Sequence, residues 1–113
     1  MSTDRELLEA AAKAIGRTLT WDGDNPPYPR AREDHWNPHW NPLESDGDAL
    51  RLAVKMNLNI AYDPAPDGPM VCVSAPWCDD FPDYFWFEWL LKDAPAATRR
   101  AIVRAAAQIG AAA

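Results

Sequence analysis

The fold is decided by residues 59–74, which read NIAYDPAPDGPMVCVS. Both ends of this stretch, 59–63 and 70–74, are rich in β-branched and aromatic residues, and the six residues between them include three prolines and a glycine. Such a pattern predicts two strands joined by a turn. We therefore expect an antiparallel hairpin, in which Cys72 is a buried strand residue.

Two further strands are predicted on either side of this hairpin. Residues 84–91, YFWFEWLL, have three aromatic residues and a leucine at one set of alternate positions, and two aromatic residues, a glutamate and a leucine at the other. Successive side chains of a strand point to opposite faces, so both faces of this strand are largely apolar. We expect both faces to be covered. Residues 18–21, TLTW, predict a short strand before an acidic turn.

The first predicted helix starts at a capping box and ends at a glycine. The hydroxyl of Thr3 can accept a hydrogen bond from the amide of Glu6, whose carboxylate reaches back to the cap. Gly16 supplies the left-handed residue that ends a helix.

Two more helices are predicted over residues 46–56 and from residue 93 onward. Asp46 and Asp93 can cap them, and Gly110 is expected to end the last one. The apolar side of the second helix is expected to comprise Ala49, Leu50, Ala53, Val54 and Met56. The apolar side of the last helix is expected to comprise Ile102, Ala105, Ala106 and Ile109.

These elements predict an α/β protein. We expect a three-layer α-β-α sandwich of about four short, mainly antiparallel strands and three helices, because strands with two apolar faces need a layer on each side. A single domain is expected to span residues 1–113. Within it, 26–42 is a long loop with five prolines in seventeen positions, and 111–113 is a frayed tail.

The chain is acidic, with a formal net charge of −6 over 113 residues. Residues 44–93 hold ten acidic and three basic side chains, whereas the last twenty residues hold three arginines and no acid. This balance argues against direct nucleic-acid binding, which depends on Lys and Arg neutralising phosphates. We expect a protein partner.

The cysteines and the apolar runs indicate the compartment. Two cysteines, Cys72 and Cys78, are too few for a secreted disulfide scaffold. The aromatic run 85–87 is stopped by Glu88, well short of the roughly 18 apolar residues that a membrane span needs. These features predict a cytoplasmic protein without a membrane anchor.

Three stretches of the chain form a recognisable pattern: residues 3–16, residues 40–60, which contain WNPL and DGDALRLAVK, and residues 93–110, which contain AATRRAIVRAAA. They are similar to stretches of small tailed-phage and prophage proteins that contain the phage ABA-sandwich domain. The resemblance implies an α-β-α sandwich and a phage origin, and it implies no catalytic residues. This chain departs from the family by an additional Trp36-Asn37-Pro38 and by an acidic, aromatic segment at 76–89.

The doubled Trp-Asn-Pro has two interpretations. Asn before Pro favours an extended or turn conformation, and each indole offers a large apolar face with one N–H donor. Trp36 and Trp40 either clamp the long loop onto the body of the protein or form a recognition surface, since tryptophan is enriched among interface anchors. The solvent exposure of the two side chains distinguishes these interpretations.

The segment 77–89 interleaves carboxylates with aromatic residues. A solvated turn is one interpretation. The other is a patch that docks on a basic groove, where carboxylates supply charge complementarity and aromatic residues supply apolar anchors.

Other constellations predict different chemistry. Arg99, Arg100 and Arg104 either hold an anionic ligand, such as a signalling nucleotide, or pair with neighbouring acids. His35 and His39 are four residues apart, which on a helix would suit a metal-dependent hydrolase, but proline lies between them. A Cys78 nucleophile assisted by a histidine is a further alternative, and no glycine-rich phosphate loop occurs.

The sequence therefore predicts a non-enzymatic phage protein, without cofactor or metal, that inhibits a bacterial defence system. An anti-CRISPR protein that occludes a nucleic-acid-binding or partner surface of a host complex is the leading form of this hypothesis. A nucleotide-binding sponge and, after it, a metal-dependent hydrolase are the alternatives. The expected partner-binding residues are Asp79, Asp80, Asp83, Trp77, Trp86, Trp36 and Trp40.

Overall fold

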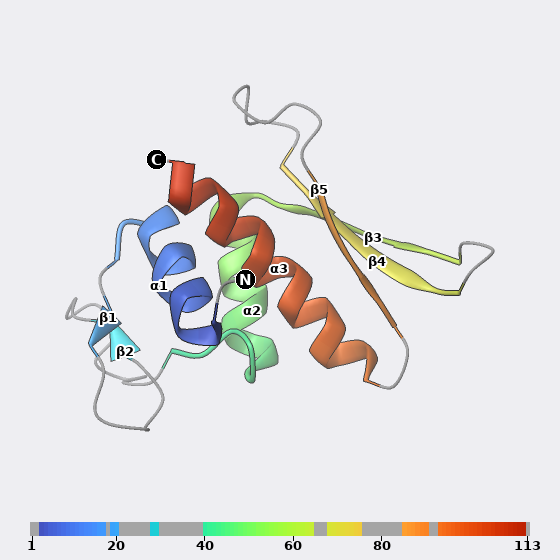
Figure 1. Cartoon of the computed structure of the whole chain (residues 1–113), viewed down its shortest axis with the longest axis horizontal. Helices are drawn as coiled ribbons and strands as arrows, with labels where there is room; N and C mark the ends of the chain where they lie inside the picture. The colour runs from blue at the N-terminus through green and yellow to red at the C-terminus, as the bar shows by residue number, and fades with distance from the viewer. Residues whose placement is uncertain are drawn as a thin grey trace.

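Three helices and two small sheets make up the part of the chain that the computed structural model describes (Figure 1). The described residues are 3–17, 19–20, 28–29, 40–64, 68–75, 85–90 and 93–112. The elements in chain order are α1 (Asp4–Ala14), β1 (Leu19–Thr20), β2 (Tyr28–Pro29), α2 (Asp46–Met56), β3 (Asn59–Asp63), β4 (Met70–Ser74), β5 (Phe85–Trp89) and α3 (Ala94–Ala112). The predicted α/β class is confirmed.

The larger sheet is antiparallel, with β4 between β3 and β5. The predicted hairpin is confirmed, since β3 and β4 have the expected bounds and pair in register, with Ile60 opposite Val73. β1 pairs instead with β2 in a separate two-stranded sheet. The large sheet therefore has three described strands rather than four. β2 lies inside the predicted loop 26–42 and was missed, because two residues that include a proline show no alternation.

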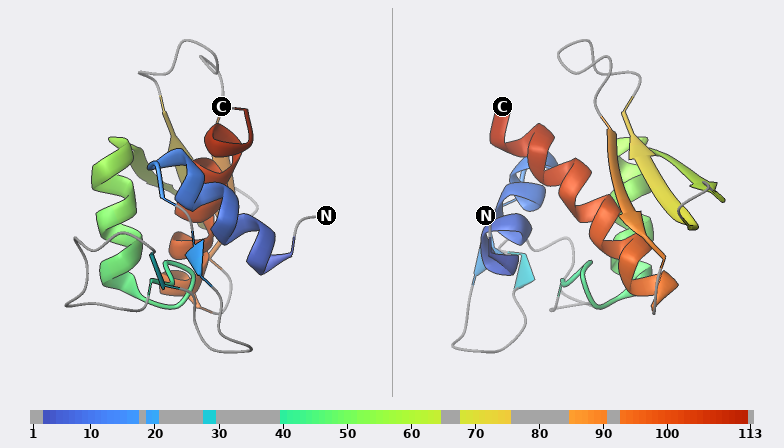
Figure 2. Two further views of the ribbon diagram at one scale, coloured as in Figure 1. Left: turned by 90° about the vertical axis from the view of Figure 1, so that its left-hand side faces the viewer. Right: turned by 45° about the vertical axis from the view of Figure 1, so that its right-hand side comes forward.

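The layer order differs from the expected sandwich. Helix α3 lies between α1 and the sheet (Figures 1 and 2). Val71 and Val73 of β4 are fully buried and belong to the same core cluster as α3. Among the described residues, no helix covers the opposite face of the sheet, where Trp89 is 37% exposed. The sheet is thus an outer layer there, and its outer face carries apolar residues toward solvent.

Cys72 lies on this outer face. It alternates with Val71 and Val73 along β4 and is half-buried rather than buried as predicted. Its Sγ is 3.7 Å from Sδ of Met70, which is also half-buried. The sulfur atoms therefore pack on each other beside the sheet.

Helix α1 begins and ends where the sequence predicts. The Thr3 hydroxyl accepts from the Glu6 amide at 3.1 Å, and the Thr3 amide donates to the Glu6 carboxylate at 3.2 Å. At the other end Gly16 has φ +75°, and the amide of Arg17 donates to the carbonyl of Ala12 at 2.9 Å. This is a Schellman ending, in which glycine accommodates the left-handed conformation.

The capping box makes a prediction about pH. The backbone amide of Thr3 and then its hydroxyl lower the pKa of the Glu6 carboxyl below its ordinary value. Because the pKa is lowered in the folded state, the stabilisation is present above the unfolded pKa and is lost as pH falls through the folded value. In the Thr3→Ala variant, NMR titration should show the pKa of the Glu6 carboxyl rising part of the way toward its ordinary value. The rise is only partial because the backbone amide of residue 3 remains. An unchanged midpoint would contradict the capping interaction.

The core between α1 and α3 is built from small residues. It includes Ala11 and Ala12 of α1 and a run of alanines on α3, all of them buried. The alanines on α3 are Ala101, Ala105, Ala106 and Ala107. Small side chains let two helix backbones approach closely.

Gly110 is part of this packing rather than the end of the helix. It is buried, and α3 continues through it to Ala112, which corrects the predicted stop at Gly110. A Cβ added at Gly110 would overlap the carbonyl oxygen of Ala10 and lie 3.1 Å from the amide nitrogen of Ala14. The start of α3 is as predicted, since Asp93 accepts from the amide of Ala96 at 2.9 Å.

Candidate functional site

The segment Trp40-Asn41-Pro42-Leu43 is a structural turn. The side-chain oxygen of Asn41 accepts a hydrogen bond from the Leu43 amide at 3.1 Å. The backbone carbonyl of Asn41 accepts one from the Ser45 amide at 2.8 Å. Trp40 is 7% exposed and belongs to the core, and the side chain of Pro42 is fully buried. The prediction of Trp40 as an exposed partner anchor is corrected, because its indole packs inside the protein as in the clamping interpretation.

A buried carboxylate, that of Asp48, ties this turn to α2. Asp48 is 4% exposed, and its side chain accepts from the Asn41 amide at 2.9 Å and from Arg51 at 2.6 Å. Its own amide donates to Ser45 Oγ at 3.2 Å, so Ser45 caps α2 in place of the predicted Asp46. The sequence signal for this arrangement is an acid three residues after a serine.

The three arginines of α3 are held by acidic groups and a carbonyl. Arg99 donates to the Leu43 carbonyl at 2.9 Å and to Asp46 at 2.6 Å. These bonds join the middle of the chain to its C-terminal helix. They match the interpretation in which the arginines pair with neighbouring acids.

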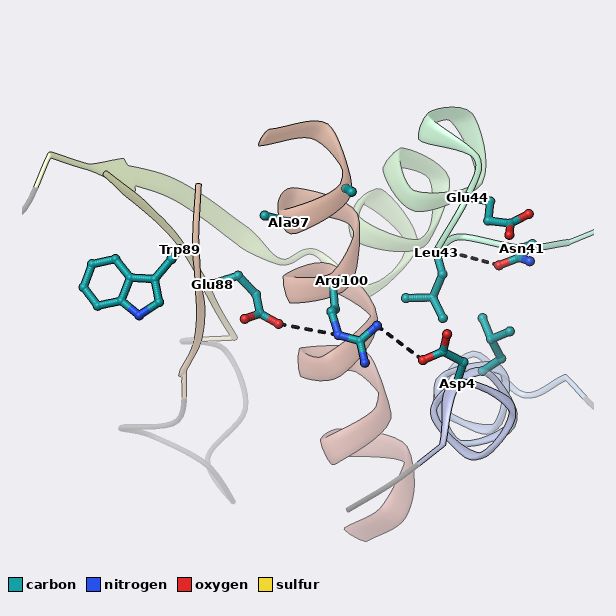
Figure 3. A pocket seen from close by; sticks show the side chains of 10 residues that line it. Asp4, Asn41, Leu43, Glu44, Glu88, Trp89, Ala97 and Arg100 are labelled. Atoms are coloured by element: carbon teal, nitrogen blue, oxygen red, sulfur yellow. Dashed lines mark hydrogen bonds and ion pairs between the residues drawn. The ribbon is translucent and has the colours of Figure 1, made fainter. Parts of the chain in front are cut away.

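Arg100 and Arg104 complete the network. Arg100 lies 3.3 Å from Asp4 and 3.7 Å from Glu88 (Figure 3). Arg104 lies 2.9 Å from Glu88. Glu88, whose side chain is 20% exposed, thus accepts a hydrogen bond from Arg104 and forms an ion pair with Arg100, one turn earlier on α3. An anionic ligand at these arginines would have to displace carboxylates, so the pairs argue against a nucleotide site there.

A charged cleft of about 460 Å³ surrounds Arg100. Asp4, Glu44 and Glu88 contribute carboxylates to its wall, and Trp89 points to the other side of β5 from Glu88 (Figure 3). Among the described residues that line it there is no histidine, cysteine, serine or lysine. The charged groups that line the described cleft are therefore three carboxylates and one guanidinium, and Arg100 pairs with two of those carboxylates, Asp4 and Glu88.

A second, apolar hollow of about 600 Å³ lies between α2, β3 and the start of α3. We call it the α2–β3 groove. It is lined by Asp46, Ala49, Leu50, Ile60, Tyr62, Ala94, Pro95, Thr98, Arg99 and Ile102. Leu50 and Tyr62 are each 61% exposed, and the hydroxyl of Tyr62 is 3.2 Å from that of Thr98.

The exposed apolar side chains correct the predicted face of α2. Leu50 and Val54 were expected in the core, yet they are 61% and 71% exposed. Leu52, which the prediction left out, is 1% exposed and belongs to the core with Met56. The helix carries apolar residues over a wider arc than the core covers, and periodicity alone does not say which part of that arc turns inward.

The other predicted partner-binding residues are described only in small part. Trp86 lies on β5 with its backbone opposite Val73. Trp36, Trp77, Asp79, Asp80 and Asp83 lie outside the described residues, as do His35, His39 and Cys78. Within the described part of the chain, no three His, Cys, Asp or Glu side chains gather to hold a metal ion. In that same part, no helix has the length and apolar character that crossing a membrane requires.

No protein-family model, curated protein or solved structure matches this chain. The similarity to phage ABA-sandwich proteins therefore stays a prediction. The described residues form an α/β fold in which three helices lie on one face of a three-stranded antiparallel sheet, with a charged cleft beside Arg100 of α3 and an apolar groove between α2, β3 and the start of α3.

Proposed function

We propose that this protein is a phage-encoded inhibitor of bacterial defence that acts in the host cytoplasm by binding, without catalysis. The leading form is an anti-CRISPR protein that occludes a basic, nucleic-acid-binding surface of the host complex. The observation that carries the proposal is the placement of charge: the arginines of α3 are held by the protein's own acids, so they do not offset the acidic surface.

The charge balance supports a basic partner. Arg99, Arg100 and Arg104 pair with Asp46, Asp4 and Glu88, and these pairs are neutral as a set. The formal net charge of −6 must therefore come from the remaining groups. A surface with excess carboxylates complements a groove built for phosphates, and such complementarity speeds encounter and favours the correct partner.

The aromatic residues beside the acids would supply apolar contact area. Tryptophan is enriched among the residues that contribute most to interface affinity. In this proposal Trp77, Trp86 and Trp36 are the apolar anchors, and Asp79, Asp80 and Asp83 take the place of phosphates. Trp40 is excluded from the set because it is buried.

Competition for target DNA tests the proposal. Purified protein is titrated into CRISPR effector complexes, each bound to labelled target DNA, and anisotropy reports release of the DNA. We expect the protein to release the labelled DNA from the sensitive complex without any chemical turnover. We expect the triple variant Asp79→Lys, Asp80→Lys, Asp83→Lys to weaken binding to the sensitive complex about 30-fold, which corresponds to about 2 kcal/mol.

The control variants separate charge from folding. The triple aspartate-to-asparagine variant should give an intermediate loss, and Glu9→Lys, on the exposed side of α1, should change the affinity little. Equal affinity of the wild type and the lysine triple variant would refute the groove-occluding mechanism. Heat release with cyclic nucleotides would favour the ligand-binding alternative, and turnover abolished by one histidine or cysteine substitution would favour an enzyme.

A further inference from the structure

The edge of β3 has no strand partner among the described residues, because the sheet order is β3-β4-β5. β3 has five residues, NIAYD, and four of them are exposed. It contains no proline, lysine or arginine, the residues with which proteins commonly block pairing at a sheet edge. Among the described residues, no strand therefore pairs with this edge of the sheet.

The α2–β3 groove borders this edge on the helix side of the sheet. Tyr62 of β3 and Leu50 of α2 line the groove, and Val54 lies one turn beyond Leu50. These three are among the four large apolar side chains that the described surface exposes most. Such a group beside an open hollow is typical of a binding surface. Figure 2 shows β3 at the side of the sheet away from β5.

We propose that this edge and groove bind a second copy of the chain. The β3 strands of two copies pair antiparallel about a two-fold axis at Ala61, which joins the two sheets into one of six described strands. The inference goes beyond the proposed function and does not depend on it. The partner is the chain itself, because the sequence of β3 is complementary to itself in this register.

The register places favourable pairs opposite each other. Asn59 of one copy faces Asp63 of the other, so an amide donor meets a carboxylate. Ile60 faces Tyr62 of the other copy on the helix side, because both residues lie on the face that Val71 and Val73 share. Ala61 faces Ala61 at the axis, where a small side chain lets the strands approach. No like charges are opposed within the strand pair.

In this two-fold arrangement, apolar side chains of the second copy cover the α2–β3 groove. A two-fold axis perpendicular to the sheet keeps the helices of both copies on one side, so each copy's Tyr62 and Leu50 lie over the paired β3 strands. Apolar side chains exposed in the single chain then contact one another. β-augmentation of this kind uses backbone hydrogen bonds for affinity and alternate side chains for specificity.

Salt dependence distinguishes this contact from binding to a basic partner. Each copy has a formal net charge of −6, and two copies repel each other. Added salt screens that repulsion, so the dimer should tighten between about 50 and about 500 mM NaCl, over which the Debye length falls from about 14 Å to about 4 Å. Binding to a basic groove should weaken over the same range.

Analytical ultracentrifugation of the full chain is the first test. The wild type should form a concentration-dependent dimer, and Ala61→Lys, which opposes two ammonium groups at the axis, should weaken it about 30-fold. Ala111→Lys, at an exposed position on the last turn of α3, is the matched control and should leave the dimer unchanged. A monomer at all concentrations, or a dimer that Ala61→Lys does not weaken, overturns the proposal.

A cross-linking test fixes the register. Ala61→Cys is made together with Cys72→Ser and Cys78→Ser, because Cys72 lies directly opposite Ala61 on β4 and would form a bond within one copy. Oxidation should link two copies through position 61. Asn59→Cys in the same background should not link, since its counterpart lies opposite residue 63. Linking through position 59 and not 61 refutes the register, and a dimer that links through neither refutes β3 pairing in favour of the β5 edge or the outer sheet face.

Discussion

The Gly110→Ala variant is expected to lose about 3 kcal/mol of unfolding free energy. The added Cβ would overlap the carbonyl oxygen of Ala10 and lie 3.0 Å from its carbonyl carbon. Both atoms belong to the backbone of α1, so the clash cannot be relieved by rotating a side chain. The gain of about 1 kcal/mol in helix propensity from glycine to alanine is smaller than this cost. Urea denaturation followed by circular dichroism measures the difference.

Gly47→Ala is the matched control for this prediction. Gly47 lies in the first turn of α2, and its added Cβ would meet the Arg51 guanidinium, the flexible end of a side chain, at 3.3 Å. We expect this variant to be neutral or more stable by up to about 1 kcal/mol. A Gly110→Ala protein as stable as the wild type would contradict the close packing of α1 on α3.

The Asp48→Ala variant is expected to lose about 3 kcal/mol. Asp48 is 4% exposed, and its carboxylate accepts from the Asn41 amide at 2.9 Å and from Arg51 at 2.6 Å. Truncation removes the acceptor of the Asn41 amide and leaves a gap where the carboxylate was. Because Trp40 and Pro42 precede and follow Asn41 in the buried turn, loosening this bond should also loosen their packing.

Two variants divide this effect into charge and hydrogen bonding. Asp48→Asn keeps an acceptor for the Asn41 amide and should lose about 1–2 kcal/mol. Arg51→Ala should lose less than about 1 kcal/mol, because the Arg51 side chain is 65% exposed. If Arg51→Ala costs as much as Asp48→Ala, the ion pair rather than the turn carries the stabilisation. Thermal unfolding of the three variants gives the ranking.

The site was less predictable than the elements that surround it. The sequence left two roles for the arginines of α3, binding an anionic ligand or pairing with neighbouring acids. The short distances from these arginines to Asp46, Asp4 and Glu88 favour pairing. The sequence left two interpretations of Trp40, a clamp and a recognition surface, and the burial of its side chain favours the clamp. These contacts join residues as far apart as Asp4 and Arg100, and local patterns carry no information on such pairs.

Neighbouring residues were sufficient to predict the local elements. The capping box at Thr3, the left-handed glycine at residue 16 and the hairpin of β3 and β4 depend on short-range hydrogen bonds, backbone conformation and alternation, which neighbouring residues specify.

Three features could be seen only in the folded protein: how the layers are stacked, which part of α2's apolar arc faces the core, and that Gly110 is a packing contact rather than a helix end. These features depend on burial and close approach, and both are set by the residues that lie across the core, which are distant in the sequence. An apolar residue has the same local pattern whether it meets a helix, solvent or a second copy of the chain.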